Sequence, residues 1–424
     1  MSMRILVLAA PLALVTQALG AQLARKVDGA NSGNVEFTFA GRPGVCGDGR
    51  TFVRVDGDFW MGHFNDNARA ECEPGPVRVV IVRVDREPIR VESYVGPVAH
   101  DSLSTDVGRV AAGDAASYLM QLATSAEGRV ARDALTAASL ADSAQITRQL
   151  LAIARDQTKS RELRRSALSW AVRPRAGSGL PMDEGLKVLT TIANDVNEQQ
   201  SMRQQATSQL GRFERGEGIP TLITMAQRDA DPWLARQALE TLNRSGDPRA
   251  RRAVRDFVTS AGTPEDIRTA AITALAGEYA TAKDGDLIRD AYGRLTGDRA
   301  RDAAISAVAS VGGPASRTWL ANLVRNKDQA MRQRRKAAEQ IGRGGSSSTE
   351  IASLYDAVDD AEIRSVLIDV LAQTGTKDAG AKLLSIAKSD PQVTTRKRAI
   401  GALARFEDPT IKNALRDLVE RGTP

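Results

Sequence analysis

The feature that most constrains this chain is an internal repeat of about 33 residues that covers residues 104–424. The string at residues 131–135 recurs in altered form eight more times, and its second alanine marks the same position in each copy. These anchor positions are Ala134, Ala167, Ala206, Ala238, Ala271, Ala304, Ala337, Leu367 and Ala399, separated by 33, 39, 32, 33, 33, 33, 30 and 32 residues. Self-similarity at such a period indicates stacked copies of one supersecondary element.

Each copy carries the pattern of a helical hairpin. Apolar residues follow most anchors at one and four positions further on, as Leu239 and Leu242 follow Ala238, and these offsets share one face of an α-helix. Glycines often end this first helix, and prolines such as Pro248 begin a second apolar helix. One hairpin cannot bury both apolar faces, whereas stacked copies can. We therefore predict a mainly helical fold over residues 104–424, a right-handed superhelix of about nine hairpins.

A small all-β domain is predicted before the repeats, over residues 21–100. Apolar and polar residues alternate in 77–84 and again in 89–95, with a turn between them, which is typical of a β-hairpin. Cys46 and Cys72 are predicted to form a disulfide. Closing their 26-residue interval should add about 3 kcal/mol of stability. A redox-active pair is the alternative, but the Cys-x-x-Cys spacing that activates such thiols is missing.

The first twenty residues have the composition of a Sec-type signal peptide. Arg4 precedes an apolar run over residues 5–15, and Ala18 and Gly20 supply the small residues of a cleavage site before Ala21. An N-terminal anchor helix that stays attached is the alternative. No later apolar run is about eighteen residues long. We expect a periplasmic or secreted protein that does not enter the membrane after signal removal.

The composition leaves little material for catalysis. The chain has two cysteines and two histidines, too few for a zinc cluster, and we find no nucleotide-binding or hydrolase motif. The acidic clusters at Asp56 and beside His63 fit turns better than a calcium loop, which needs a longer ligand series. We predict no catalytic, cofactor-binding or metal-binding residues. The net charge of +6, from 58 basic and 52 acidic groups, argues only weakly for a polyanionic partner.

The repeat resembles the short bacterial HEAT repeat, including the variety first named from phycobilin lyase subunits. The strings that carry the resemblance are DPWLARQALETL at residues 231–242 and SGDPRARRAV at residues 245–254. The resemblance covers about three quarters of the chain and implies an α-solenoid that acts as a scaffold. In that picture the anchor helices would line the concave face. The resemblance says little about activity, because one fold serves many functions.

An arginine recurs three positions before most anchors. It lies on the buried face at the start of the anchor helix, where a guanidinium needs carboxylates or carbonyls. Acids in the preceding turns are Asp231, Asp298, Asp328, Asp360 and Asp390. The HEAT resemblance implies an Asp–Arg ladder that ties repeat to repeat, which we favour over a basic rail for a polyanion. The predicted ladder comprises Arg164, Arg203, Arg268, Arg301, Arg334, Arg364 and Arg396.

The exposed side of the anchor helices is the candidate partner surface. Two positions after the anchors come Ser169, Ser208, Glu240, Thr273, Ser306, Glu339 and Asp369. This small, polar and mixed-charge surface suits a protein or extended peptide, and we expect no nucleic acid. The basic cluster from Arg332 to Lys336 is predicted to be a solvated helix face.

Three functions are compatible with these patterns. We favour an exported, non-enzymatic scaffold or adaptor that binds another protein through the solenoid. The alternatives are an envelope enzyme or accessory subunit, with a site at the β-domain–solenoid junction near His63 and His100, and a structural spacer without a partner.

Overall fold

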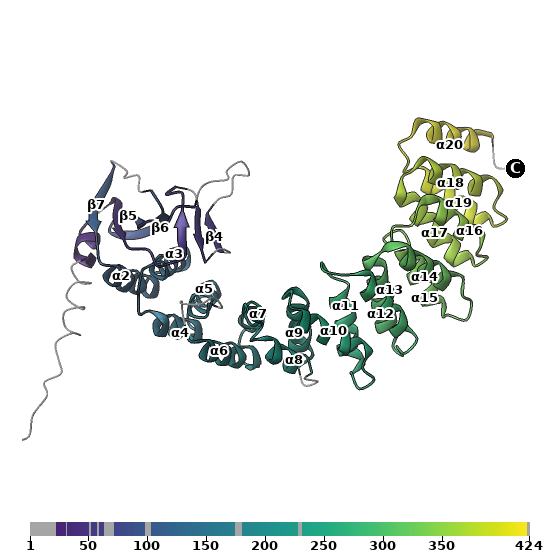
Figure 1. Ribbon diagram of the computed structural model, residues 1–424. Coiled ribbons are helices and arrows are strands. Elements are labelled where there is room, and N and C mark those ends of the chain that lie inside the picture. Colours follow the sequence, from purple (N-terminus) through teal and green to yellow (C-terminus); the bar gives the residue numbers. More distant parts are fainter. Residues whose placement is uncertain are drawn as a thin grey trace, which may run out of the picture. The chain divides into compact units, whose positions relative to one another are not determined.

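The computed structural model describes residues 23–30, 32–50, 52–56, 59–62, 72–97, 103–173, 180–227 and 231–421. The chain divides into two compact units, Met1–Gln209 and Leu210–Pro424, and Figure 1 labels the elements of both. The predicted signal peptide at residues 1–20 lies outside the described residues, as do His63 and His100.

The first unit contains two sheets. The larger comprises β1 (Gly33–Phe39), β5 (Val77–Val84), β6 (Glu87–Val95) and β7 (Ser104–Arg109), in the order β6-β5-β1-β7; the smaller comprises β2 (Val45–Gly47), β3 (Phe52–Val55) and β4 (Phe59–Gly62). Alternation along β1 places Val35, Phe37 and Phe39 on one face, where each is at most 1% exposed. The ring of Phe37 meets that of Tyr118 in a helix of the same unit, with centroids 6.3 Å apart. The β core is therefore closed by a helix.

Strand β7 corrects the predicted start of the helical array at residue 104. It runs parallel to β1, with Ser104 opposite Asn34, so the sheet continues beyond residue 100 and the helices begin at Ala112. Every residue of β7 is exposed or half-buried, and its sequence shows no alternation of apolar residues. Backbone pairing with a strand 70 residues earlier holds it, which local patterns cannot indicate.

The rest of the described chain is helical. The helices are α2 (Ala112–Ser125), α3 (Gly128–Ser139), α4 (Thr147–Arg155), α5 (Arg161–Ala171), α6 (Met182–Asn194), α7 (Gln200–Leu210), α8 (Ile219–Ala226), α9 (Pro232–Arg244), α10 (Pro248–Thr259), α11 (Glu265–Leu275), α12 (Ala282–Tyr292), α13 (Asp298–Val311), α14 (Gly313–Arg325), α15 (Met331–Gln340), α16 (Ser348–Asp356), α17 (Ala361–Thr374), α18 (Lys377–Ser389), α19 (Val393–Leu403) and α20 (Pro409–Arg421). Each predicted anchor lies on an odd-numbered helix from α3 to α19, and each is fully buried. A mainly helical fold after a small β region is thus confirmed. None of the described helices combines the length and apolarity that crossing a membrane requires.

Helices of the second unit pack in two layers. The odd-numbered helices α9 to α19 contact one another in series and form what we call the anchor layer. The even-numbered helices pack behind them, and each from α8 to α18 contacts the anchor helix that follows it, as α10 contacts α11 and α14 contacts α15. Small anchor residues such as Ala271 let these helices approach closely. The apolar core is consequently continuous along the unit.

Gly47 is expected to be intolerant of any side chain. An ideal Cβ at this position would lie 2.6 Å from the carbonyl oxygen of Phe52 and closer still to that of Val95. Both obstacles are backbone, so Gly47→Ala should lower the free energy of unfolding by about 1–3 kcal/mol. The control is Gly113→Ala in α2, where an added Cβ would meet nothing within 4 Å. This substitution should raise the free energy of unfolding by about 0.5–1 kcal/mol. Urea denaturation measures both, and equal effects would contradict the close approach.

Candidate functional site

Arg164 shows how the arginine ladder is built. Its side chain is fully buried at the start of α5, where Ser160 caps the helix by accepting from the Leu163 amide. The Nε donates to the carbonyl of Ala154 at 3.0 Å, close to the last residue of α4. The two Nη atoms donate to the two carboxylate oxygens of Glu198, at 3.0 and 2.5 Å. One side chain thereby joins the end of one helix, the start of the next and the turn before α7.

The same geometry recurs in the second unit. The Nε of Arg334 donates to the Val324 carbonyl at 2.9 Å, and its Nη2 lies 2.5 Å from Asp360. Arg364 donates to the Val358 carbonyl at 2.7 Å. Arg334 thus satisfies a carbonyl in the last turn of α14, where carbonyls lack partners within the helix. Arg364 satisfies one in the turn between α16 and α17.

The other predicted ladder arginines donate to backbone carbonyls. Arg203 reaches Ala193 at 2.9 Å, Arg268 reaches Ser260 at 2.7 Å, Arg301 reaches Leu295 at 2.8 Å and Arg396 reaches Asp390 at 2.8 Å. Among the predicted acids, Asp360 and Asp390 accept from ladder arginines. Asp231 caps α9 by accepting from Leu234, and Asp298 accepts from Gln333 at 2.8 Å. Glu198, the partner of Arg164, precedes its anchor Ala206 by a spacing similar to that of the predicted acids, but the prediction considered aspartates alone.

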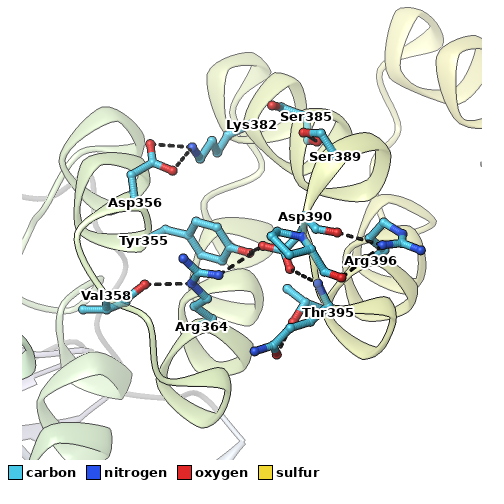
Figure 2. Close-up of polar contacts among 12 residues, drawn as sticks. Tyr355, Asp356, Val358, Arg364, Lys382, Ser385, Ser389, Asp390, Thr395 and Arg396 are labelled. Atoms are coloured by element: carbon cyan, nitrogen blue, oxygen red, sulfur yellow. Dashed lines mark hydrogen bonds and ion pairs between the residues drawn. The ribbon is translucent and has the colours of Figure 1, made fainter. Parts of the chain in front are cut away.

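Figure 2 shows the ladder where it is most elaborate, around Asp390. The carboxylate accepts from the Tyr355 hydroxyl at 2.6 Å and from Arg364 at 3.4 Å, while its backbone carbonyl accepts from Arg396. The Arg364 guanidinium lies 5.2 Å from the centre of the Tyr355 ring. Burial, reinforced by the hydrogen bond to Asp390, raises the pKa of Tyr355. The hydroxyl is therefore a fixed donor, and the cluster braces α16, α17 and α19.

A second buried ion cluster centres on Asp284, in the first turn of α12. Its side chain is fully buried. Arg251 and Arg255 of α10 reach it at 2.6 and 2.8 Å, and Thr281 donates through both its amide and its hydroxyl. Burial by itself would raise the pKa of this carboxyl, but the hydrogen bonds from Arg255, Thr281 and Arg251 outweigh it and lower the pKa to about 2. Sequence reasoning missed this cluster because it does not recur from repeat to repeat.

The predicted partner-facing residues differ in how exposed they are. Glu240, Thr273 and Glu339 are exposed, whereas Ser169, Ser208, Ser306 and Asp369 are half-buried. Ser169 accepts from Gln205 at 2.8 Å, and Asp369 pairs with Arg398. Thr273 and Ser306 each donate to a carbonyl of their own helix. The most accessible positions are therefore on α9, α11 and α15.

The basic cluster at residues 332–336 is largely ion-paired. Arg332 reaches Asp302 of α13 at 2.7 Å, and Arg335 reaches Glu362 of α17 at 3.2 Å. Arg334 belongs to the ladder. These pairs connect α15 to the anchor helices on either side of it, so three of the four cations already have carboxylate partners.

Where the β region of the first unit meets its helices, two arginines share one carboxylate. Asp56 lies 2.5 Å from Arg42 and 3.0 Å from Arg173, and the Arg173 guanidinium lies 4.6 Å from the centre of the Trp170 ring. The amide of Arg42 also donates to the Leu140 carbonyl at 2.9 Å. This junction is thus packed around Trp170, which is 5% exposed.

The predicted disulfide is present between Cys46 and Cys72. Cys46 lies in β2, so the bond fastens the smaller sheet to the chain that leads into β5. In the part of the chain that the structure describes, no group of three or more His, Cys, Asp or Glu side chains is placed to hold a metal ion.

Comparisons with known proteins agree with this architecture. A family model described as HEAT repeats matches residues 186–276, which confirms the predicted resemblance for that segment. No curated protein matches the sequence.

Three solved structures are similar to parts of this chain. Human deoxyhypusine hydroxylase is 17% identical, with 62% of this chain and 96% of that chain covered and a TM-score of 0.25. The CpcE–CpcF complex of phycocyanin lyase from Nostoc sp. PCC7120 is 17% identical over 63% of this chain and 93% of that one, with a TM-score of 0.25. Kap121p bound to Ste12p is 13% identical over 72% of this chain and 38% of that one, with a TM-score of 0.40.

Proposed function

We propose that this protein is an exported, non-enzymatic scaffold that binds another protein or an extended peptide through the outer surface of its anchor helices. The observation that carries the proposal is that the two faces of these helices differ in burial. Their inner faces hold the core and the arginine ladder, while Glu240 and Thr273 are exposed. Side chains on rigid helices that the fold does not use are well placed to recognise a partner.

Two further features support the proposal. The Cys46–Cys72 disulfide fits an oxidising compartment such as the periplasm or the extracellular space, in agreement with the predicted signal peptide. The ladder contacts also brace neighbouring helices, as Arg334 does with Asp360. A braced surface loses little conformational entropy when a partner binds.

Crosslinking followed by mass spectrometry in intact source cells tests this proposal. Thr273→Arg places a long charged side chain on the anchor layer and is expected to abolish the partner's crosslinks, because a buried unpaired charge at an interface costs several kcal/mol. The matched control is Thr318→Arg, on an exposed position of the even-numbered helix α14, which should leave the crosslinks intact. Loss of crosslinks in both variants, or in neither, would contradict binding through the anchor layer.

A further inference from the structure

In the last three helices of the anchor layer, the charged side chains that lack an ion-pair partner in the described part of the chain are positive. The exposed or half-buried carboxylates of α15, α17 and α19, among the described residues, are all paired with arginines. Glu339 and Glu362 both meet Arg335, and Asp369 meets Arg398. No acid in these helices is left to neutralise further cations.

Several cations at this end of the layer have no acidic partner among the residues that the structure describes. Lys336 of α15 is half-buried, and Lys397 of α19 is exposed. Arg343 and Arg405, in the turns that follow α15 and α19, are also exposed. These four positions give the α15–α19 surface an excess of positive charge that no internal contact offsets.

The first half of the anchor layer differs. On α9, α11 and α13, three exposed cations have no carboxylate partner among the described residues: Arg236, Arg244 and Arg299. They are balanced by three acids that form no ion pair there, Glu240, Glu265 and Asp266. The Glu240 carboxylate accepts from the neutral Gln237 amide. The positive excess is thus confined to α15–α19, although both halves come from the same repeat.

We propose that the α15–α19 surface binds an extended acidic segment of the protein partner, an inference that rests on the proposed function. Adjacent helix axes are about 8–10 Å apart, so Lys336 and Lys397, two helices apart, are separated by roughly 16–20 Å. An extended chain rises about 3.3 Å per residue. The segment therefore places its carboxylates about five or six residues apart.

The surface suits a peptide better than a nucleic acid. The ion pairs of Glu339 with Arg335 and of Asp369 with Arg398 interrupt the positive charge. A continuous row of phosphates needs that charge without gaps, whereas a peptide can place neutral residues opposite these pairs. The described helices α15, α17 and α19 contain no aromatic residue on which bases could stack. Val393, 51% exposed, and the half-buried Val366 offer apolar contact to a peptide.

Fluorescence anisotropy with the full chain tests this inference. The probe is a labelled twelve-residue Gly/Ser peptide that carries two Glu pairs about six residues apart. We expect it to bind, to bind more weakly as salt is raised, and to lose at least tenfold in affinity with the double variant Lys336→Glu, Lys397→Glu. The matched control, Arg236→Glu with Arg299→Glu, removes two equally unpaired cations and should change affinity less than twofold. Thermal unfolding by circular dichroism checks that both variants fold.

Three outcomes would overturn the inference: no binding of the acidic peptide, equal loss in both double variants, or equally tight binding of a single-stranded oligonucleotide with the same charge. In cells, a partner whose crosslinks are lost with Thr273→Arg but kept with Lys336→Glu, Lys397→Glu would refute this inference and leave the proposed function standing. Crosslinks that survive in all of these variants would refute the proposed function itself.

Discussion

Replacing Arg164 with alanine is expected to lower the free energy of unfolding of the surrounding helices by about 3–5 kcal/mol. The side chain is fully buried, and its removal leaves the Glu198 carboxylate, whose side chain is 8% exposed, without a cation. The Ala154 carbonyl loses its donor as well. Because a stacked array need not unfold in one step, the measurement is hydrogen exchange of α4, α5 and α7 together with the urea midpoint.

The control for this prediction is the same substitution at another position of the ladder. Arg268 is half-buried and donates to the carbonyls of Ser260 and Thr263. Arg268→Ala should cost about 1–1.5 kcal/mol, the net worth of ordinary hydrogen bonds. Equal losses at Arg164 and Arg268 would show that Glu198 contributes nothing, and that the ladder acts only by capping helix ends.

The helices were predictable because their determinants are local and repeated. Leu239 and Leu242 follow Ala238 at the spacing of one helical face, and that face is fully buried. Nine agreeing copies make chance an inadequate explanation for the pattern. The predicted disulfide and the hairpin of β5 and β6 likewise depended on signals that are readable along the chain.

What the sequence did not reveal depends on contacts between distant segments. Strand β7 is held by its pairing to β1, and the junction of Arg42, Asp56 and Arg173 joins residues more than 100 positions apart. Tertiary pairing of this kind has no local pattern. The partner surface was predictable only as a helix face. Asp369 pairs with Arg398, whereas Lys336 has no acidic partner among the described residues. This difference depends on how neighbouring helices pack, which the sequence of one helix does not reveal.

Asp284 is expected to make the second unit sensitive to acid. Its pKa is about 2 in the folded protein against an ordinary value of 3.8. A carboxyl with a lowered folded pKa adds stability above its unfolded pKa and loses that contribution as pH falls through the folded value. Asp284 should therefore contribute about 2 kcal/mol above pH ~4, lost progressively between pH ~4 and ~2. Urea midpoints measured across this range, with hydrogen exchange of α10 and α12, report the loss.

Asp284→Asn separates this contribution from the general effect of acid on other carboxylates. The variant should be less stable at pH 7 by about 2–4 kcal/mol, because Arg251 and Arg255 then face a neutral amide. The difference from the natural protein should shrink as pH falls toward 2, because the carboxyl of the natural protein is increasingly protonated there and becomes neutral like the amide. The control, Asp286→Asn, removes an acid two residues away on the same helix whose side chain is 61% exposed, and it should change stability by less than about 1 kcal/mol. A difference that stays constant from pH 7 to pH 2 would mean that Asp284 stabilises through the shape of its hydrogen bonds, since a charge-dependent contribution must disappear with the charge.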